Sequence, residues 1–173
     1  MPGGLYDTMA AKTKEPKFHS LRLLRSKSIP YQLHSYPETL IQAAEVADHL
    51  GITGHNMYKT LVASGSDPAK PLIALIPIRD TLNLKQLAAV MQQKRVRMLT
   101  QGQAEKITGM KKGGISALAL LQRKWPVFLD SSARQWETLI LNAGRRGVQI
   151  ELKTADFIHL VAPILAHLTL PRS

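Results

Sequence analysis

The chain contains no cysteine among its 173 residues. Without cysteine it has no disulfide framework, no thiolate zinc site and no cysteine nucleophile, and it fits a reducing compartment such as the cytoplasm. It also lacks a long apolar run. The longest stretches, such as Leu72–Ile78, have the length of buried strands, whereas a membrane span needs roughly 18 apolar residues. Because residues 1–16 carry no signal-peptide core, we expect a cytoplasmic protein without a membrane segment and with a disordered leader there.

Acidic side chains are scarce. Asp and Glu total 12 against 23 Lys and Arg, which gives a formal net charge of +11. Such a surface attracts polyanions, and nucleic acid is the commonest polyanionic partner. A basic protein with no role in nucleic-acid binding is the alternative, and charge alone does not decide between the two.

Patterns for metal ligands and catalytic triads are missing. The six histidines have no metal-ligand spacing, and none stands beside a recognisable serine–acid pair. We therefore expect neither a bound metal nor any other cofactor. The histidines are His19, His34, His49, His55, His159 and His167.

Apolar periodicity predicts helices and strands that alternate irregularly along one domain at residues 17–173. Because some strands form hairpins and others are separated by helices, the pattern favours an α+β fold with a mixed sheet over a doubly wound parallel sheet. Thr39 is expected to cap its helix and Gly51 to end it. The expected helices are Lys17–Ser28, Thr39–Leu50, Asn83–Met91, Gln101–Lys106 and Thr154–Leu160. The expected strands are Tyr31–Tyr36, Asn56–Ala63, Pro71–Pro77, Arg95–Leu99, Val127–Leu129, Thr138–Leu141 and Val148–Leu152.

Lys59 is unusual for a strand residue. In an extended strand it shares a face with Met57, Leu61 and Ala63, which is the face expected to be buried. A lysine there must pair with an anion, extend to the rim or bind a ligand, because burying an unpaired ammonium group is costly. The alternative is a lysine at the end of a strand that simply reaches solvent.

Two basic, glycine-rich turns are candidates for anion binding. In the first, Gly113 and Gly114 free the backbone to direct N–H groups at an oxygen-rich ligand, and the preceding lysines add positive potential. Its order of residues is not that of a Walker loop. The second turn, Gly144–Gly147, contains two arginines suited to phosphate contacts. Each turn is also consistent with an exposed basic turn that binds nothing.

Taken in order, these segments resemble the YbaK/ProX (EbsC-like) family of aminoacyl-tRNA deacylases, which includes trans-editing domains. The resemblance rests on the ordered set, which spans residues 18 to 165, and not on any single segment. It implies a mixed, barrel-like β-sheet flanked by helices. It also implies an enzyme that hydrolyses the ester bond of tRNA mischarged with a small amino acid such as cysteine, alanine, serine or threonine. The matching segments are Ile29–Tyr36, Ala43–Glu45, Tyr58–Leu61, Ile78–Asp80, Asn83–Lys85, Gly113–Ser116, Gly144–Gly147 and Ile150–Leu152.

The same resemblance implies the residues of a site and its partners. A lysine on the pocket strand and the backbone donors of the glycine-rich loop carry the catalysis, and polar residues around them bind the substrate. A prolyl-tRNA synthetase or an elongation factor is the implied protein partner, beside the aminoacylated tRNA. The catalytic residues are Lys59, Gly113, Gly114 and Ile115. The substrate-binding residues are Tyr36, Ser116, Asn142 and Gln149. The RNA-binding residues are Lys111, Lys112, Arg145 and Arg146.

Four positions depart from the family pattern. Ala117 and Ala119 stand where members of the YbaK type usually carry proline and glycine. Asn142 and Gln149 stand where they tend to carry serine and aspartate, so a carboxylate contact to the substrate's amino group is lost. These departures favour an alternative, a catalytically inactive module of the same fold that binds tRNA or oligonucleotides. A cavity filled by Gln149 or by Ala117–Leu118 would support that module, and an open cavity with Lys59 at its rim would support the enzyme.

Overall fold

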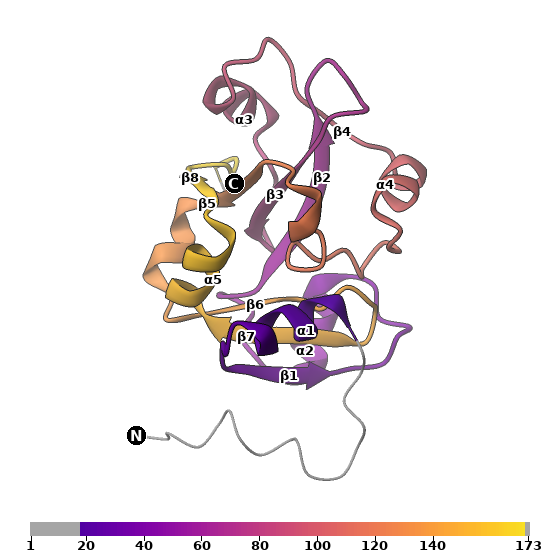
Figure 1. The fold of residues 1–173 in the computed structure, drawn as a ribbon, viewed down its shortest axis with the longest axis vertical. Helices are drawn as coiled ribbons and strands as arrows, with labels where there is room; N and C mark the ends of the chain where they lie inside the picture. Colours follow the sequence, from indigo (N-terminus) through magenta and orange to yellow (C-terminus); the bar gives the residue numbers. More distant parts are fainter. Residues whose placement is uncertain (1–17, 172–173) are drawn as a thin grey trace.

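The computed structural model describes residues 18–171, so the leader predicted at residues 1–16 lies outside the described part of the chain. Helices and strands follow one another in mixed order and form one α+β domain, which confirms the expected fold class (Figure 1). The helices are α1 (His19–Ser26), α2 (Ala43–Leu50), α3 (Leu84–Val90), α4 (Gln101–Thr108) and α5 (Thr154–Val161). The strands are β1 (Tyr31–Ser35), β2 (Tyr58–Ser64), β3 (Pro71–Pro77), β4 (Arg97–Met98), β5 (Val127–Asp130), β6 (Thr138–Asn142), β7 (Val148–Lys153) and β8 (Ile164–Ala166).

The strands form two sheets that meet at β2. The larger sheet has the order β4-β2-β3-β5-β8, with β3, β5 and β8 parallel to one another and the other pairs antiparallel. The smaller sheet, β1-β7-β6, is antiparallel throughout. A bridge between Met57 and Ile140 joins the two sheets, and the N–H group of Ile140 donates to the Asn56 carbonyl at 2.9 Å. The result is the mixed, barrel-like arrangement expected from the sequence.

One edge of β2 is only partly covered. β3 pairs with β2 along its whole length, but on the other edge β6 meets it only at Met57 and β4 only at Ala63 and Ser64. Among the described residues, no strand pairs with the stretch between these two contacts. The Met57 carbonyl accepts a hydrogen bond from Ile78 N–H at 3.0 Å on the edge of β2 that faces β3. The Val62 carbonyl accepts one from Leu99 N–H at 3.1 Å on the opposite edge, which is the partly covered one. Because this direction alternates along a strand, the backbone groups of Thr60 face the opening.

Helices α1 and α2 cover opposite faces of the smaller sheet. Leu21 and Leu24 of α1 are fully buried in the largest apolar cluster, together with Leu141 of β6. Val46 of α2 packs with Ile140 on the other face. Leucines spaced three apart give α1 its apolar stripe, and burying each contributes about 1.5–3 kcal/mol. The smaller sheet is thereby held between two helices at the lower end of the molecule in Figure 1.

The start of α2 corrects the prediction of a Thr39 cap. The helix begins at Ala43, and its N-cap residue is Gln42, which makes no side-chain capping bond. The chain makes a separate turn first, because the carbonyl of Pro37 accepts a hydrogen bond from Leu40 N–H at 3.0 Å. The predicted end is confirmed, since Gly51 adopts a left-handed conformation with φ of 67°. Strand β8 was not predicted at all: it is three residues long and directly follows Pro163.

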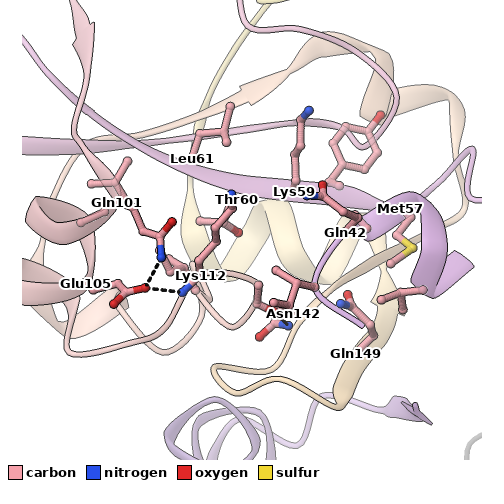
Figure 2. Close-up of a pocket in the computed structure, with 18 of the residues that line it drawn as sticks. Gln42, Met57, Lys59, Thr60, Leu61, Gln101, Glu105, Lys112, Asn142 and Gln149 are labelled. Carbon is pink, nitrogen blue, oxygen red and sulfur yellow. Dashed lines mark hydrogen bonds between the residues drawn. The ribbon is translucent and has the colours of Figure 1, made fainter. Parts of the chain in front are cut away.

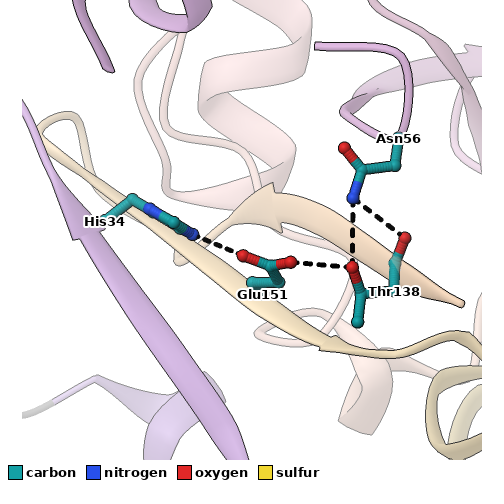
Figure 3. A network of polar contacts seen from close by, with 4 residues as sticks. All are labelled: His34, Asn56, Thr138 and Glu151. Atoms are coloured by element: carbon teal, nitrogen blue, oxygen red, sulfur yellow. Dashed lines mark hydrogen bonds and ion pairs between the residues drawn. The ribbon is translucent and has the colours of Figure 1, made fainter. Parts of the chain in front are cut away.

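A chain of polar contacts links the strands of the smaller sheet (Figure 3). His34 Nε2 and Glu151 Oε2 lie 2.7 Å apart, and the Thr138 hydroxyl donates to the other Glu151 oxygen at 2.7 Å. Asn56 Nδ2 in turn donates to the Thr138 carbonyl at 3.1 Å. The hydrogen bond with His34 lowers the pKa of Glu151, and the bond from Thr138 adds to this, whereas burial acts in the opposite direction. Glu151 therefore stabilises the sheet in its ionised form.

We expect Glu151→Gln to reduce the free energy of unfolding by about 1–2 kcal/mol near neutral pH, because hydrogen bonds to a charged group become bonds to a neutral one. Since the folded-state pKa is depressed, this contribution is present above the ordinary value of 4.5 and is lost as the pH falls through the lowered value. Urea unfolding at about pH 7 and about pH 3 measures both parts. Glu137→Gln, at an exposed position just before β6, is the matched control. An equal effect of both substitutions at neutral pH would contradict the role of Glu151.

Candidate functional site

A cavity of about 340 Å³ opens at the uncovered edge of β2 (Figure 2). Its walls come from the start of α2, from β2, from β4 with α4, from the glycine-rich loop and from the ends of β6 and β7. This volume is at the small end of the range for ligand sites in proteins. Predicted site residues from separate segments meet here: Tyr36, Lys59, Lys112, Gly113, Ile115, Asn142 and Gln149 line the cavity.

Two buried amides organise the inner end of the cavity. Asn142 Nδ2 donates to the Gly113 carbonyl at 2.7 Å and to the Tyr36 hydroxyl at 3.3 Å. Gln149 Nε2 donates to the same hydroxyl at 3.4 Å. The Asn142 side-chain oxygen accepts from Gly144 N–H at 2.8 Å, so Asn142 ties the glycine-rich loop to the turn after β6. Asn142 and Gln149, two of the four positions at which the sequence resemblance implied a departure, are thus both built into the cavity wall.

Two oxygen atoms in this wall lack a hydrogen-bond partner among the described residues. They are Gln149 Oε1 and Thr60 Oγ1, and both atoms are buried. Buried polar atoms in folded proteins are nearly always paired, so unpaired oxygen atoms in two residues that line a cavity are candidate partners for a ligand or water. Thr60 was not among the predicted site residues. Strand alternation places Thr60 on the face opposite Lys59, which was not the face expected to be buried, so no signal in the sequence singled it out.

Lys59 lies at the cavity wall on β2. Figure 2 shows Lys59 and Leu61 projecting to one side of the strand and Thr60 to the other, as the alternation of a strand requires. Burial lowers the pKa of the Lys59 ammonium group, and the negative charge of Asp80 acts in the opposite direction. A partly buried ammonium group that has lost hydration is well suited to contact an anionic ligand.

The glycine-rich loop packs directly on the turn Gly144–Gly147. A Cβ atom at Gly114 would lie 2.9 Å from the backbone nitrogen of Arg146 and 3.1 Å from the Cα of Arg145. The N–H group of Gly114 donates to the Lys111 carbonyl at 2.8 Å, so it is used within the loop. Gly114 is buried and permits close contact between the two turns, while Gly113 reaches the cavity.

Ser116 faces away from the cavity lining. It is buried, and its hydroxyl accepts from Ala119 N–H at 3.2 Å at the start of the following turn. Ala117 and Leu118 lie in the largest apolar cluster and do not fill the cavity. The cavity is therefore open, with Lys59 in its wall.

The predicted RNA-binding residues lie on the surface beside the cavity. Arg145 forms an exposed ion pair with Glu38 at 3.7 Å, and Arg146 Nε donates to the Lys112 carbonyl at 2.6 Å. Lys111 and Lys112 are exposed. These side chains bring positive charge to the same rim, and the two arginines also have bonds within the protein.

Glu105 is the carboxylate in the cavity lining. Its Oε1 accepts from Lys112 N–H at 3.2 Å and from Gln101 Nε2 at 3.1 Å, shown as dashed lines in Figure 2. The hydrogen bond from the Lys112 backbone is the main cause of its lowered pKa. Glu105 therefore fixes the outer part of the glycine-rich loop to α4.

No group of three or more His, Cys, Asp or Glu side chains within residues 18–171 is arranged to hold a metal ion. None of the helices in that range is long and apolar enough to cross a membrane.

Comparison with known proteins identifies relatives over most of the chain. Residues 38–160 match the model of the aminoacyl-tRNA editing domain. A protein of Enterococcus faecalis, EbsC, named as a candidate deacylase of Cys-tRNA(Pro) and Cys-tRNA(Cys), is 33% identical over 163 residues, covering 93% of this chain and 98% of the relative.

Solved structures share the fold at low sequence identity. A hypothetical protein named APE2540 has a TM-score of 0.79 at 18% identity, covering 88% of this chain and 99% of its own. A candidate trans-editing enzyme for prolyl-tRNA synthetase has a TM-score of 0.74 at 16% identity, covering 91% of this chain and 100% of its own.

Proposed function

Since the chain belongs to the aminoacyl-tRNA editing domain family, we propose that it hydrolyses the ester bond of tRNA mischarged with a small amino acid. Membership confirms the family resemblance seen in the sequence and assigns the chain to the deacylases, which are hydrolases. One observation carries the proposal. The cavity at the open edge of β2 is lined by a partly buried lysine and by two residues, Gln149 and Thr60, that each carry a buried oxygen atom without a partner among the described residues.

The amino-acid end of the substrate occupies the cavity. Its α-ammonium group carries three donors and no acceptor, which matches the unpartnered acceptors Gln149 Oε1 and Thr60 Oγ1. Gln149 would then take, as a neutral acceptor, the role that an aspartate carboxylate could play in relatives. Lys59 at the wall contacts the terminal phosphate or ribose of the tRNA, where charge-assisted hydrogen bonds are strong.

Hydrolysis requires a polarised carbonyl and a nucleophile. Gly113 and Ile115 line the cavity, so their backbone N–H groups are the candidates to stabilise the oxyanion, whereas the Gly114 N–H is used within the loop. A water molecule attacks the carbonyl carbon. The ester bond to the ribose oxygen then breaks, the proton from water passes to that oxygen, and free amino acid and tRNA are released. For a cysteinyl ester the substrate's own thiol is an alternative first nucleophile.

The size of the cavity supplies the selectivity. A cavity of about 340 Å³ with a mostly apolar wall holds the amino-acid end together with the neighbouring ribose, which leaves room for a small side chain, in the manner of a second sieve. The similarity to EbsC makes cysteine the first candidate, and alanine, serine and threonine are the others.

The open cavity favours the enzyme over a catalytically inactive tRNA-binding module of the same fold. Neither Gln149 nor the Ala117–Leu118 segment closes it, and Lys59 remains in its wall. As an editing enzyme the protein would act in the cytoplasm on aminoacylated tRNA, with prolyl-tRNA synthetase or an elongation factor as protein partner. The structural likeness to a candidate trans-editing enzyme for prolyl-tRNA synthetase supports the first of these.

The direct test is a deacylation assay with purified protein on tRNAs charged with cysteine, alanine, serine, threonine and, as an oversized control, phenylalanine. We expect rapid hydrolysis of one or more of the small aminoacyl-tRNAs and no acceleration for phenylalanine. Salt-sensitive binding of charged tRNA without hydrolysis of any small aminoacyl ester would refute the catalytic proposal and leave the binding module.

A further inference from the structure

A second cavity, of about 490 Å³, lies outside the carboxyl ends of the three parallel strands. Asp80 follows β3, Asp130 ends β5 and His167 follows β8, and all three residues line this cavity. Crevices at the carboxyl ends of parallel strands are recurrent ligand sites, because backbone and side chains from several strands converge there. The proposed deacylation reaction does not use this cavity.

The carboxylate of Asp130, in the wall of the second cavity, is already hydrogen-bonded within the protein. The Asp130 carboxylate accepts from Ser132 N–H at 3.0 Å and from Leu168 N–H at 2.8 Å. The Ser132 hydroxyl is bonded to the Tyr58 hydroxyl at 2.7 Å. A metal ion is therefore a poor fit, in agreement with the lack of a metal-binding cluster among residues 18–171. The features available to a ligand are the rings and the cation at the rim.

Two rings, those of His55 and Trp136, lie at the rim of the second cavity. The rings of His55 and Trp136 lie with their centroids 6.0 Å apart at an angle of 32°, Trp136 is partly exposed and His55 is exposed. Arg79 lines the same cavity with its side chain exposed and in ion-pair contact with Asp48 at 3.6 Å. Aromatic rings beside a cation are how proteins bind unpaired nucleic-acid strands, the rings stacking on bases and the cation contacting phosphate.

The two cavities lie close together around the first residues of β2. Tyr58 lines the first cavity, and its hydroxyl reaches Ser132 in the wall of the second. Lys59 lines the first cavity, and the charge of Asp80, in the second, acts on it. An RNA strand that leaves the first cavity past Lys59 would therefore pass close to the second cavity.

We propose that the second cavity binds an unpaired nucleobase of the tRNA 3′ end, stacked on Trp136, while the aminoacyl ester occupies the first cavity. This inference rests on the proposed function for the first cavity. It assigns to Trp136, His55 and Arg79 a role in holding RNA without reading its sequence, since every base has a face that stacks.

Tryptophan fluorescence provides the test, because the chain has two tryptophans and they lie at opposite ends of β5. Trp125→Phe leaves Trp136 as the reporter, and Trp136→Phe leaves Trp125, which packs with Arg123 at 5.5 Å. Uncharged 5′-CCA-3′ RNA is expected to quench the fluorescence of the first protein and not of the second. Quenching of neither, or of both alike, would overturn the proposal.

Measurements of KM and kcat on aminoacylated tRNA distinguish a role of Trp136 in RNA binding from a role in the fold. Trp136→Leu is expected to raise KM about tenfold at unchanged kcat, since stacking on one base is lost. Trp136→Phe keeps a ring and should restore KM most of the way, and Trp125→Leu should leave KM unchanged. An unaltered KM in Trp136→Leu would refute the second cavity as an RNA site. If CCA quenches Trp136 but no aminoacyl ester is hydrolysed, the second site stands and the deacylase proposal fails.

Discussion

Lys59→Met is expected to lower kcat/KM on a mischarged tRNA about 100-fold, because a charge-assisted contact to phosphate or ribose is lost. The same substitution should leave the melting temperature unchanged or raise it. Burial lowers the pKa of Lys59, so the protonated form is disfavoured in the folded state relative to the unfolded chain. This destabilisation is present at neutral pH and is relieved only as the pH rises through the lowered pKa. If Lys59 stabilised the fold, its replacement by methionine would lower the melting temperature.

The matched control is Lys70→Met, at an exposed position in the turn between β2 and β3. It removes one positive charge outside the cavity lining and should reduce kcat/KM only slightly, through weaker long-range attraction of the tRNA. Deacylation rates and thermal unfolding curves of the two variants are compared at the same ionic strength. A fall in melting temperature for Lys59→Met that matches its loss of activity would show that the lysine supports the fold and not the substrate.

Gly114→Ala is expected to reduce kcat/KM at least tenfold and the free energy of unfolding by about 1–3 kcal/mol, the usual range for forcing extra volume into a packed site. The added carbon would stand 2.9 Å from the Arg146 nitrogen. That neighbour is backbone and cannot rotate away, so the two turns must separate. Gly113, one residue earlier, is hydrogen-bonded to Asn142 and would move with the loop.

Gly102→Ala is the control for Gly114→Ala. Nothing lies within 4 Å of a Cβ atom built at Gly102, which is in the first turn of α4. Alanine there should be neutral or stabilising by about 0.5–1 kcal/mol, because glycine costs more conformational entropy in a helix. Urea unfolding and the deacylation assay measure both variants. Equal stability of Gly114→Ala and the wild type would contradict the tight contact between the turns.

Local patterns in the sequence predicted most elements of the fold. The stripe of Leu21 and Leu24 indicated α1, and the alternation around Lys59 indicated β2, because both signals lie within a few residues. The start of α2 was missed because Thr39 is a good capping residue in isolation. In the structure Thr39 lies instead in a separate turn, closed by the hydrogen bond from Leu40 N–H to the Pro37 carbonyl, and the helix begins after it. Strand β8 exists only through its pairing with β5, and three residues carry too little pattern to reveal it.

The residues that line the cavity were predictable only in part, and the geometry of the cavity was not predictable. The resemblance to a family placed Tyr36, Lys59 and Gln149 together, and the cavity lining brings them together. The free oxygen of Thr60 was missed, because it depends on which edge of β2 stays unpaired. The packing of Gly114 on Arg146 joins positions 32 residues apart in number, which only the folded chain can show.

Because of the gap between β6 and β4 along β2, changes in the strand framework and changes in the wall of the cavity can occur independently in evolution. The opening is a property of strand connectivity, and it persists whatever side chains stand around it. Part of its wall comes from α2, α4 and a loop, none of which pairs with that stretch of β2, and the rest comes from β4, β6, β7 and β2 itself. Substitutions in α2, α4 and the loop can therefore alter which molecule fits without disturbing a strand, whereas Asn142 and Gln149 stand opposite each other on the paired strands β6 and β7, where only the side chain can change. A scaffold of this kind can acquire a new substrate while its framework stays unchanged.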